Sequence, residues 1–253
     1  MADPMHQFQI QKIVELPTVN VAGMPIDLSI TNSTLATMIA AVLVLGVFGA
    51  ASMRAQVVPG RLQVVGEGLF GLIDNLAESI IGHDGRKYFP FVFSLFLLIL
   101  GMNMVGMFLY FTATSQLAVT ATLGLLTILA VVGVGIAKNG LGFFKLFVPS
   151  GVPWPMLFLI VPIEILSFLI RPVTLALRLF GNMLGGHVVL KIFAGFIISL
   201  GALGLAGWVG AALALSSVVA LTALEFMVAF LQAFVFAVLA CVYLNDVVNL
   251  HSH

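Results

Sequence analysis

The chain has 253 residues, of which 61% are hydrophobic and only 8% are Asp, Glu, Lys or Arg. A soluble domain carries about 25% charged residues, so this chain has too little charge to cover the surface of a water-soluble protein. We therefore classify it as an integral membrane protein. Its ten basic and ten acidic residues give zero net charge, which excludes a basic surface for nucleic acid.

Residues 1–30 are predicted to form an extramembrane segment, and residues 31–253 a single membrane domain. The first segment contains charged residues such as Glu15 and no continuous apolar run, so we expect no cleavable signal peptide. The chain has one cysteine, Cys241, which lies among apolar residues and is interpreted as a packing residue.

Apolar stretches long enough to cross a membrane begin after residue 30. A helix needs about 20 apolar residues to span a hydrocarbon core about 30 Å thick. Residues 35–53, about 89–111 and about 117–137 satisfy this requirement. Residues 112–116 form an uncharged turn, which predicts that the second and third spans are a hairpin.

Residues 61 to about 82 have a different pattern, which predicts an amphipathic helix at the membrane interface or against a partner. Apolar residues recur at steps of three and four from Leu62 to Ile80, and Glu67, Asp74 and Glu78 fall between them.

The last hundred or so residues are almost continuously apolar, with prolines and glycines as the main interruptions. They predict a long helical hairpin over about residues 150–248. Each helix of about 40 residues would be close to 60 Å long, so both must tilt strongly, bend or protrude. The predicted fold is an all-α integral membrane protein with about five transmembrane helices, of which the last two are long and strongly tilted.

Basic residues between the spans predict the orientation. Arg54, Arg61, Arg86 and Lys87 lie between spans one and two, and Lys138 and Lys145 between spans three and four. Because basic loops stay on the cytoplasmic side, these two loops and the C-terminus are expected there, with the N-terminus on the opposite side.

A polar stripe runs through the fourth apolar segment. At about 100° per residue, six side chains fall within about 80° of one helix face. These are Glu164, Ser167, Arg171, Thr174, Arg178 and Asn182. His187 falls on another side, at about 140° from Glu164.

The last segment carries a sparser polar line of Glu225, Gln232 and Tyr243, which lie within about 20° of each other. Internal neutralisation is one interpretation of these charges: Glu164 with Arg171, and Glu225 with His187, would serve only to pack the helices. Arg178 has no acid within two turns on its own helix, however, and needs a partner from elsewhere.

Arg178 differs from His187 and Glu225 in its ability to exchange protons. An arginine stays protonated, so it cannot relay a proton but can attract a carboxylate and keep it ionised. His187 and Glu225 can both gain and lose protons. The pattern therefore indicates a proton route with an electrostatic barrier.

Two long motifs resemble subunit a of the F-type ATP synthase, the stator beside the rotating c-ring. They are Arg171-Pro-Val-Thr-Leu-Ala-Leu-Arg-Leu-Phe-Gly-Asn-Met-Leu-Gly-Gly-His187 and Leu231-Gln-Ala-Phe-Val-Phe-Ala-Val-Leu-Ala-Cys-Val-Tyr243. The resemblance covers the whole chain, and the first eight residues are similar to the alphaproteobacterial form. It implies a proton-translocating subunit with two half-channels to and from the c-ring carboxylates, coupling the proton gradient to ATP synthesis.

The resemblance also implies roles for individual residues. Arg178 would be the essential arginine that faces the ring carboxylate. The path from the periplasmic side would use Asn182, His187, Glu225 and Gln232. The path to the cytoplasmic side would use Glu164, Ser167 and Thr174. Arg171, Asn103 and Tyr243 would have supporting roles.

The implied partners are the c-ring, the peripheral-stalk b-type subunits, the rest of the complex and the lipid bilayer. The implied location is a bacterial inner membrane, with the mitochondrial inner membrane as the alternative. No cofactor, metal or nucleotide site is predicted, because no Gly-Lys dipeptide of a phosphate-binding loop and no metal-ligand motif occurs. The chain is therefore not expected to be an enzyme by itself.

Other function classes fit less well. A secondary transporter or a stand-alone ion channel is the alternative, but a transporter should show two related halves with interrupted helices, and the polar residues belong only to the last two segments. A redox-linked proton pump subunit would need axial histidine pairs or a quinone site, and the sequence indicates neither.

Overall fold

A computed structural model describes residues 11–15, 19–21, 24–26, 29–53, 59–108, 112–148, 153–202 and 204–250. Four sequence-based predictions fall outside these residues: the motif of the first eight residues, Arg54, the end of a span at Phe111 and the start of the long hairpin at residue 150.

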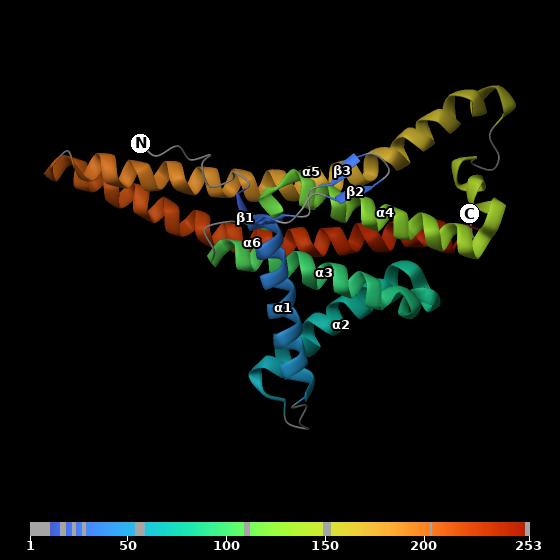
Figure 1. Cartoon of the computed structure of the whole chain (residues 1–253), viewed down its shortest axis with the longest axis horizontal. Coiled ribbons are helices and arrows are strands. Elements are labelled where there is room, and N and C mark those ends of the chain that lie inside the picture. Colours follow the sequence, from blue (N-terminus) through green and yellow to red (C-terminus); the bar gives the residue numbers. More distant parts are fainter. Residues whose placement is uncertain are drawn as a thin grey trace. The chain divides into compact units, whose positions relative to one another are not determined.

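Six α-helices account for most of the described residues (Figure 1). They are α1 (Asn32–Met53), α2 (Arg61–Ile81), α3 (Gly85–Phe108), α4 (Leu117–Asn139), α5 (Trp154–Gly201) and α6 (Leu205–Val248). The short 3-10 helices η2 (Gly82–Asp84), η3 (Ala113–Ser115) and η4 (Gly140–Phe147) lie between them. The predicted helical fold class is confirmed.

Four short strands precede α1 and were not predicted. β1 (Lys12–Val14) pairs with β4 (Ile30–Thr31), and β2 (Val19–Val21) pairs with β3 (Met24–Ile26), both in antiparallel fashion. Each strand has at most 3 residues, which is too short to produce a recognisable alternation of polar and apolar residues.

Five stretches of the described chain are long and apolar enough to cross a membrane: α1, Arg61–Phe108, α4, α5 and Gly207–Val248. The last two helices have 48 and 44 residues. At about 1.5 Å per residue they are about 72 and 66 Å long, more than twice the hydrocarbon thickness. The expected pair of long helices is confirmed, and their strong tilt stays a prediction.

The contacts within the chain divide it into two compact units. Both units contain residues from each of five helices, α1, α3, α4, α5 and α6. The first unit consists of Met1–Val44, Ile99–Val119 and Leu179–Gln232. The second consists of Leu45–Leu98, Thr120–Arg178 and Ala233–His253. The proposed proton-path residues are therefore described below unit by unit.

In the second unit, α2 is amphipathic, as predicted, but its buried face differs from the predicted apolar stripe. Ile73, Ala77 and Ile81 recur at steps of four and are buried. Leu62 and Val65 of the predicted stripe are instead 61% and 59% exposed. The first part of the stripe is therefore not covered by the described chain, which fits contact with lipid or another subunit.

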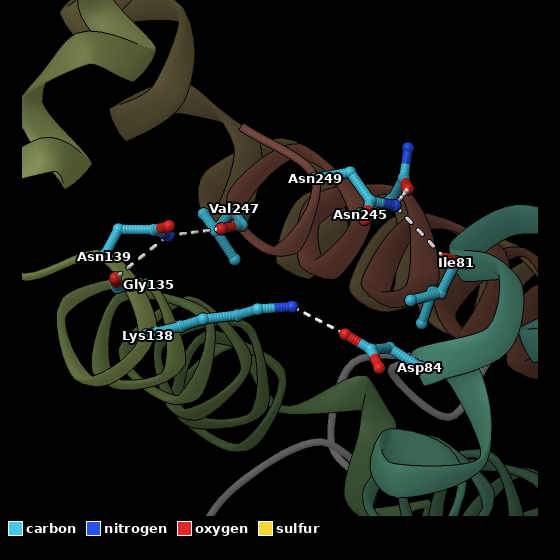
Figure 2. A network of polar contacts seen from close by, with 8 residues as sticks. All are labelled: Ile81, Asp84, Gly135, Lys138, Asn139, Asn245, Val247 and Asn249. Atoms are coloured by element: carbon cyan, nitrogen blue, oxygen red, sulfur yellow. Dashed lines mark hydrogen bonds and ion pairs between the residues drawn. The ribbon is translucent and has the colours of Figure 1, made fainter. Parts of the chain in front are cut away.

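Two asparagines join the helix ends of the second unit (Figure 2). Asn139 donates a hydrogen bond from Nδ2 to the carbonyl of Val247 at 2.6 Å, and Asn249 donates one to the carbonyl of Ile81 at 3.1 Å. Carbonyl groups in the last turn of a helix have no partner within the helix, so these side chains supply the missing donors. They connect the end of α6 to the ends of α2 and α4.

Asn139→Leu should lower the free energy of unfolding of the purified protein by about 1–2 kcal/mol, because it leaves the Val247 carbonyl without its donor. The readout is the thermal unfolding midpoint in detergent. Lys138→Met is the matched control: Lys138 forms an ion pair with Asp84 at 2.6 Å (Figure 2), but both side chains are exposed, so little change is expected. Equal shifts for the two variants would contradict the stabilising role of Asn139.

Candidate functional site

An acid and an imidazole meet inside the first unit. His187 Nδ1 on α5 lies 3.7 Å from Glu225 Oε1 on α6. Glu225 is only 6% exposed, and His187 is partly buried. The structure therefore brings together the two titratable residues that the sequence analysis placed on a proton path.

Gly186 makes this close approach possible. A Cβ atom at that position would lie 2.7 Å from Glu225 Oε1 and 3.2 Å from its carboxyl carbon. Any larger residue would push the carboxyl group away from α5. The glycine directly before His187 thus brings the acid against the helix that carries the imidazole.

Two amides form a second polar contact between α5 and α6 in this unit. Asn182 Nδ2 donates a hydrogen bond to Gln232 Oε1 at 3.0 Å. A cavity of about 240 Å³ is lined by Asn182, Gly186 and Glu225 together with apolar side chains. This volume is large enough for several water molecules beside polar groups.

Asn103 supports the same part of α6 from α3. Its side chain is fully buried, and Nδ2 donates a hydrogen bond to the carbonyl of Ala229 at 3.1 Å. Ala229 lies one turn after Glu225 and less than one turn before Gln232. Asn103 therefore holds the backbone that carries both polar side chains.

Thr112 is a site residue that sequence analysis missed. Its Oγ1 lies 2.7 Å from His187 Nε2, whereas the other ring nitrogen, Nδ1, faces Glu225. The two residues are 75 positions apart in the chain. No periodicity links them, so the sequence placed residue 112 only in a polar turn.

In the second unit, Arg171 is neutralised by an acid that the sequence analysis did not consider. Arg171 Nη1 lies 2.9 Å from Asp246 Oδ2, and the guanidinium carbon lies 4.9 Å from the centre of the Tyr243 ring. The interpretation that Arg171 pairs with Glu164 is therefore wrong. Asp246 follows Tyr243 by three residues, so extending the polar line of the last segment by one turn would have found it.

The remaining polar residues of the α5 stripe in this unit face outward. Ser167, Thr174 and Arg178 are exposed, and Glu164 is partly exposed. Within the described part of the chain, Arg178 makes no hydrogen bond or ion pair. Thr174 and Leu177, which flank Arg178 on one side of the helix, are also exposed, so Arg178 lies on the side of α5 that the described part of the chain leaves uncovered. A fixed positive charge thus lies on a surface that the described residues do not cover.

Comparison with known proteins identifies the family. The family described as ATP synthase A chain matches residues 34–245. The chain belongs to this family. ATP synthase subunit a of Rhodopseudomonas palustris is 52% identical over 249 residues, covering 98% of each chain. Subunit a of Hyphomonas neptunium is 50% identical over 252 residues, covering 99% of this chain and 98% of its own. Subunit a of Rhizobium etli is 51% identical over 252 residues, covering 99% of each chain.

Family membership decides between the function classes left open by the sequence. The chain is the non-catalytic, proton-conducting membrane stator subunit of an ATP synthase, and not a secondary transporter or a stand-alone channel. It is a multi-pass membrane protein, and its bacterial relatives imply the cell inner membrane.

Asp246→Asn should lower the free energy of unfolding by about 1–3 kcal/mol, because it leaves the partly buried Arg171 without its counter-charge. The measurement is the thermal unfolding midpoint of the purified protein. Asp84→Asn makes the same chemical change in an exposed ion pair and should have little effect. If both variants unfold at the wild-type temperature, the Arg171–Asp246 pair is not a stabilising contact.

Proposed function

We propose that this chain provides two half-channels for protons, one to and one from the carboxylates of a rotating c-ring, with Arg178 between them. The observation that carries the proposal is the contrast among the ionisable groups. Arg171 has Asp246 beside it, and His187 has Glu225. Arg178, in contrast, is exposed and makes no ion pair in the described part of the chain.

The periplasmic half-channel would use Glu225, His187, Asn182 and Gln232. The contacts among these residues and the cavity between Asn182 and Glu225 support this assignment. A proton would enter past the Glu225–His187 pair, move along water and the two amides, and neutralise a ring carboxylate. The neutral carboxyl group can then rotate into lipid, because it no longer carries the cost of an intramembrane charge.

The cytoplasmic half-channel would use Glu164, Ser167 and Thr174. These residues share the outward face of α5 in the second unit, where no described residue covers them fully. A ring carboxylate that arrives there after nearly a full turn would release its proton. Arg171, Tyr243 and Asn103 would support the paths by fixing α5 against α6 and α6 against α3.

Arg178 would keep the two half-channels separate. Its permanent charge repels a passing proton and stabilises the ionised carboxylate between proton release and proton uptake. One charge crossing 100 mV supplies about 2.3 kcal/mol, so several protons must pass for each ATP that is made. A ring of carboxylates that pass Arg178 in turn allows this accumulation.

The individual subunits that would bind this chain are also part of the proposal. The c-ring would lie against the exposed polar face of α5, and peripheral-stalk b-type subunits would bind elsewhere on the chain. The basic loops between the spans favour a cytoplasmic C-terminus and a periplasmic N-terminus. The counter-ion of Arg178 would then belong to another subunit.

Arg178→Ala should reduce ATP-driven proton pumping in inverted vesicles by at least about tenfold, because the ionised ring carboxylate loses its stabilising charge. Pumping is followed with a pH-sensitive dye, and the amount of assembled complex is checked by immunoblot. Lys145→Ala, which removes an exposed positive charge in η4, is the control and should pump normally. Normal coupled pumping by the Arg178 variant would refute its role.

Cysteines at Leu177 and Leu175 should crosslink differently to a ring subunit. Leu177 is 49% exposed and Leu175 is 1% exposed. With cysteines along the outer helix of the ring subunit, Leu177→Cys should form an oxidative crosslink and Leu175→Cys should not. Native Cys241 is buried, which keeps the background low. Equal crosslinking of both positions would contradict the ring-facing side proposed here.

A further inference from the structure

Thr112 lies between the end of α3 and the proposed periplasmic path. Its Oγ1 is 2.7 Å from His187 Nε2 and 3.1 Å from the carbonyl oxygen of Gly106. The residue is buried, and all three groups belong to the first unit. The hydroxyl group therefore sits between a backbone acceptor and the imidazole.

The hydroxyl hydrogen can serve only one of these two contacts. The Gly106 carbonyl can only accept, and its position in the last turn of α3 leaves it without a partner inside the helix. The Thr112 hydroxyl therefore donates to Gly106, and its oxygen accepts a hydrogen bond from His187. This arrangement requires the hydrogen of the neutral imidazole to be on Nε2.

The tautomer decides which nitrogen can exchange a proton with Glu225. With the hydrogen on Nε2, the unprotonated nitrogen of the neutral ring is Nδ1. Nδ1 is the atom that lies 3.7 Å from Glu225 Oε1. That oxygen is buried and has no hydrogen-bond partner among the described residues. The proton acceptor of the ring is thus directed at the carboxyl group.

The surroundings of Thr112 hold it in place. A Cβ atom on Gly106 would overlap the Thr112 side chain, so the glycine leaves room for the threonine against α3. On the other side, the Ser115 hydroxyl donates to the Thr112 carbonyl at 2.6 Å, and the backbone N–H of Ser115 donates to the same carbonyl at 3.1 Å. Thr112 is therefore fixed both at its side chain and at its backbone.

We propose that Thr112 is a positioning residue of the proton path: its hydroxyl keeps His187 in the Nε2–H tautomer, with Nδ1 facing Glu225. The inference rests on the proposed role of the His187–Glu225 pair. Thr112 itself gains and loses no proton. It acts by ensuring that the imidazole takes a proton from Glu225 at Nδ1 and returns that proton to Glu225 from the same atom, so that the pair holds an entering proton until Glu225 passes it on along the path.

The test compares Thr112→Val with Thr112→Ser in ATP-driven proton pumping by inverted vesicles that contain the whole ATP synthase. Valine keeps the shape and removes the hydroxyl, whereas serine keeps the hydroxyl and removes the methyl group. We expect valine to slow pumping by about three- to tenfold, as the loss of one orienting hydrogen bond predicts, and serine to pump at close to the wild-type rate. A packing role of the methyl group predicts the opposite order.

Two further variants separate this inference from the proposed function. Thr127→Val removes an equally buried hydroxyl, which donates only to the Leu123 carbonyl of its own helix, and should pump normally. His187→Ala should slow pumping strongly. Normal pumping by Thr112→Val together with slow pumping by His187→Ala would overturn only the role of Thr112. Normal pumping by both would overturn the proposed role of His187 and, with it, the inference.

Assembly is checked by immunoblot for each variant. If the valine variant is absent from the membrane, Thr112→Ala removes the same hydroxyl from a smaller side chain, and its comparison with serine decides the question. Alanine and serine variants that pump at equally reduced rates would overturn the proposal, because the hydroxyl would then have no effect of its own.

Discussion

The cost of placing a charge inside apolar helices is the constraint on which the polar chemistry of this chain depends. An ionised side chain at the bilayer centre costs at least about 2.5–3.5 kcal/mol, so each such group needs a partner or a way to become neutral. Arg171 meets this need with Asp246, and Glu225 lies near His187. Arg178 has no ion pair in the described part of the chain, which is why its proposed counter-ion belongs to another subunit.

Backbone packing and proton chemistry are linked through small residues in the first unit. Gly186 allows the Glu225 carboxyl group to lie against α5, and Gly106 allows Thr112 to lie against α3. A larger side chain at either position would displace a polar group and not merely loosen a helix contact. The close approach of helices, usually a matter of packing in membranes, here also sets the distance between acid and imidazole.

The sequence predicted those features that depend on local periodicity. The bounds of α2 were predicted within one residue, and the bounds of α1 and α4 within three, because apolar length and spacing define helices. That Ser167, Thr174 and Arg178 share one face of α5 followed from the helical repeat, whereas the exposure of that face did not. Helical periodicity does not link residues of different elements, so it gave no sign of the contact between His187 and Thr112, which are 75 positions apart. Arg171 and Asp246 are equally far apart, and only the place of Asp246 on the polar line of the last segment could have indicated their pairing. The predicted apolar stripe of α2 was real, but which side of the helix is buried depends on neighbours that periodicity does not reveal.

The permanently charged Arg178 lies on an exposed helix face, whereas the titratable residues Glu225 and His187 are buried or partly buried. This difference in position suits a proton path. Glu225 and His187 can become neutral, so burial beside each other is tolerable. Arg178 cannot become neutral, so an isolated, fully buried position would be prohibitively costly. On an exposed helix face it can instead be paired transiently by carboxylates of another chain. An acid fixed within this chain would neutralise Arg178 permanently, which would be incompatible with its proposed role of holding each arriving carboxylate in turn.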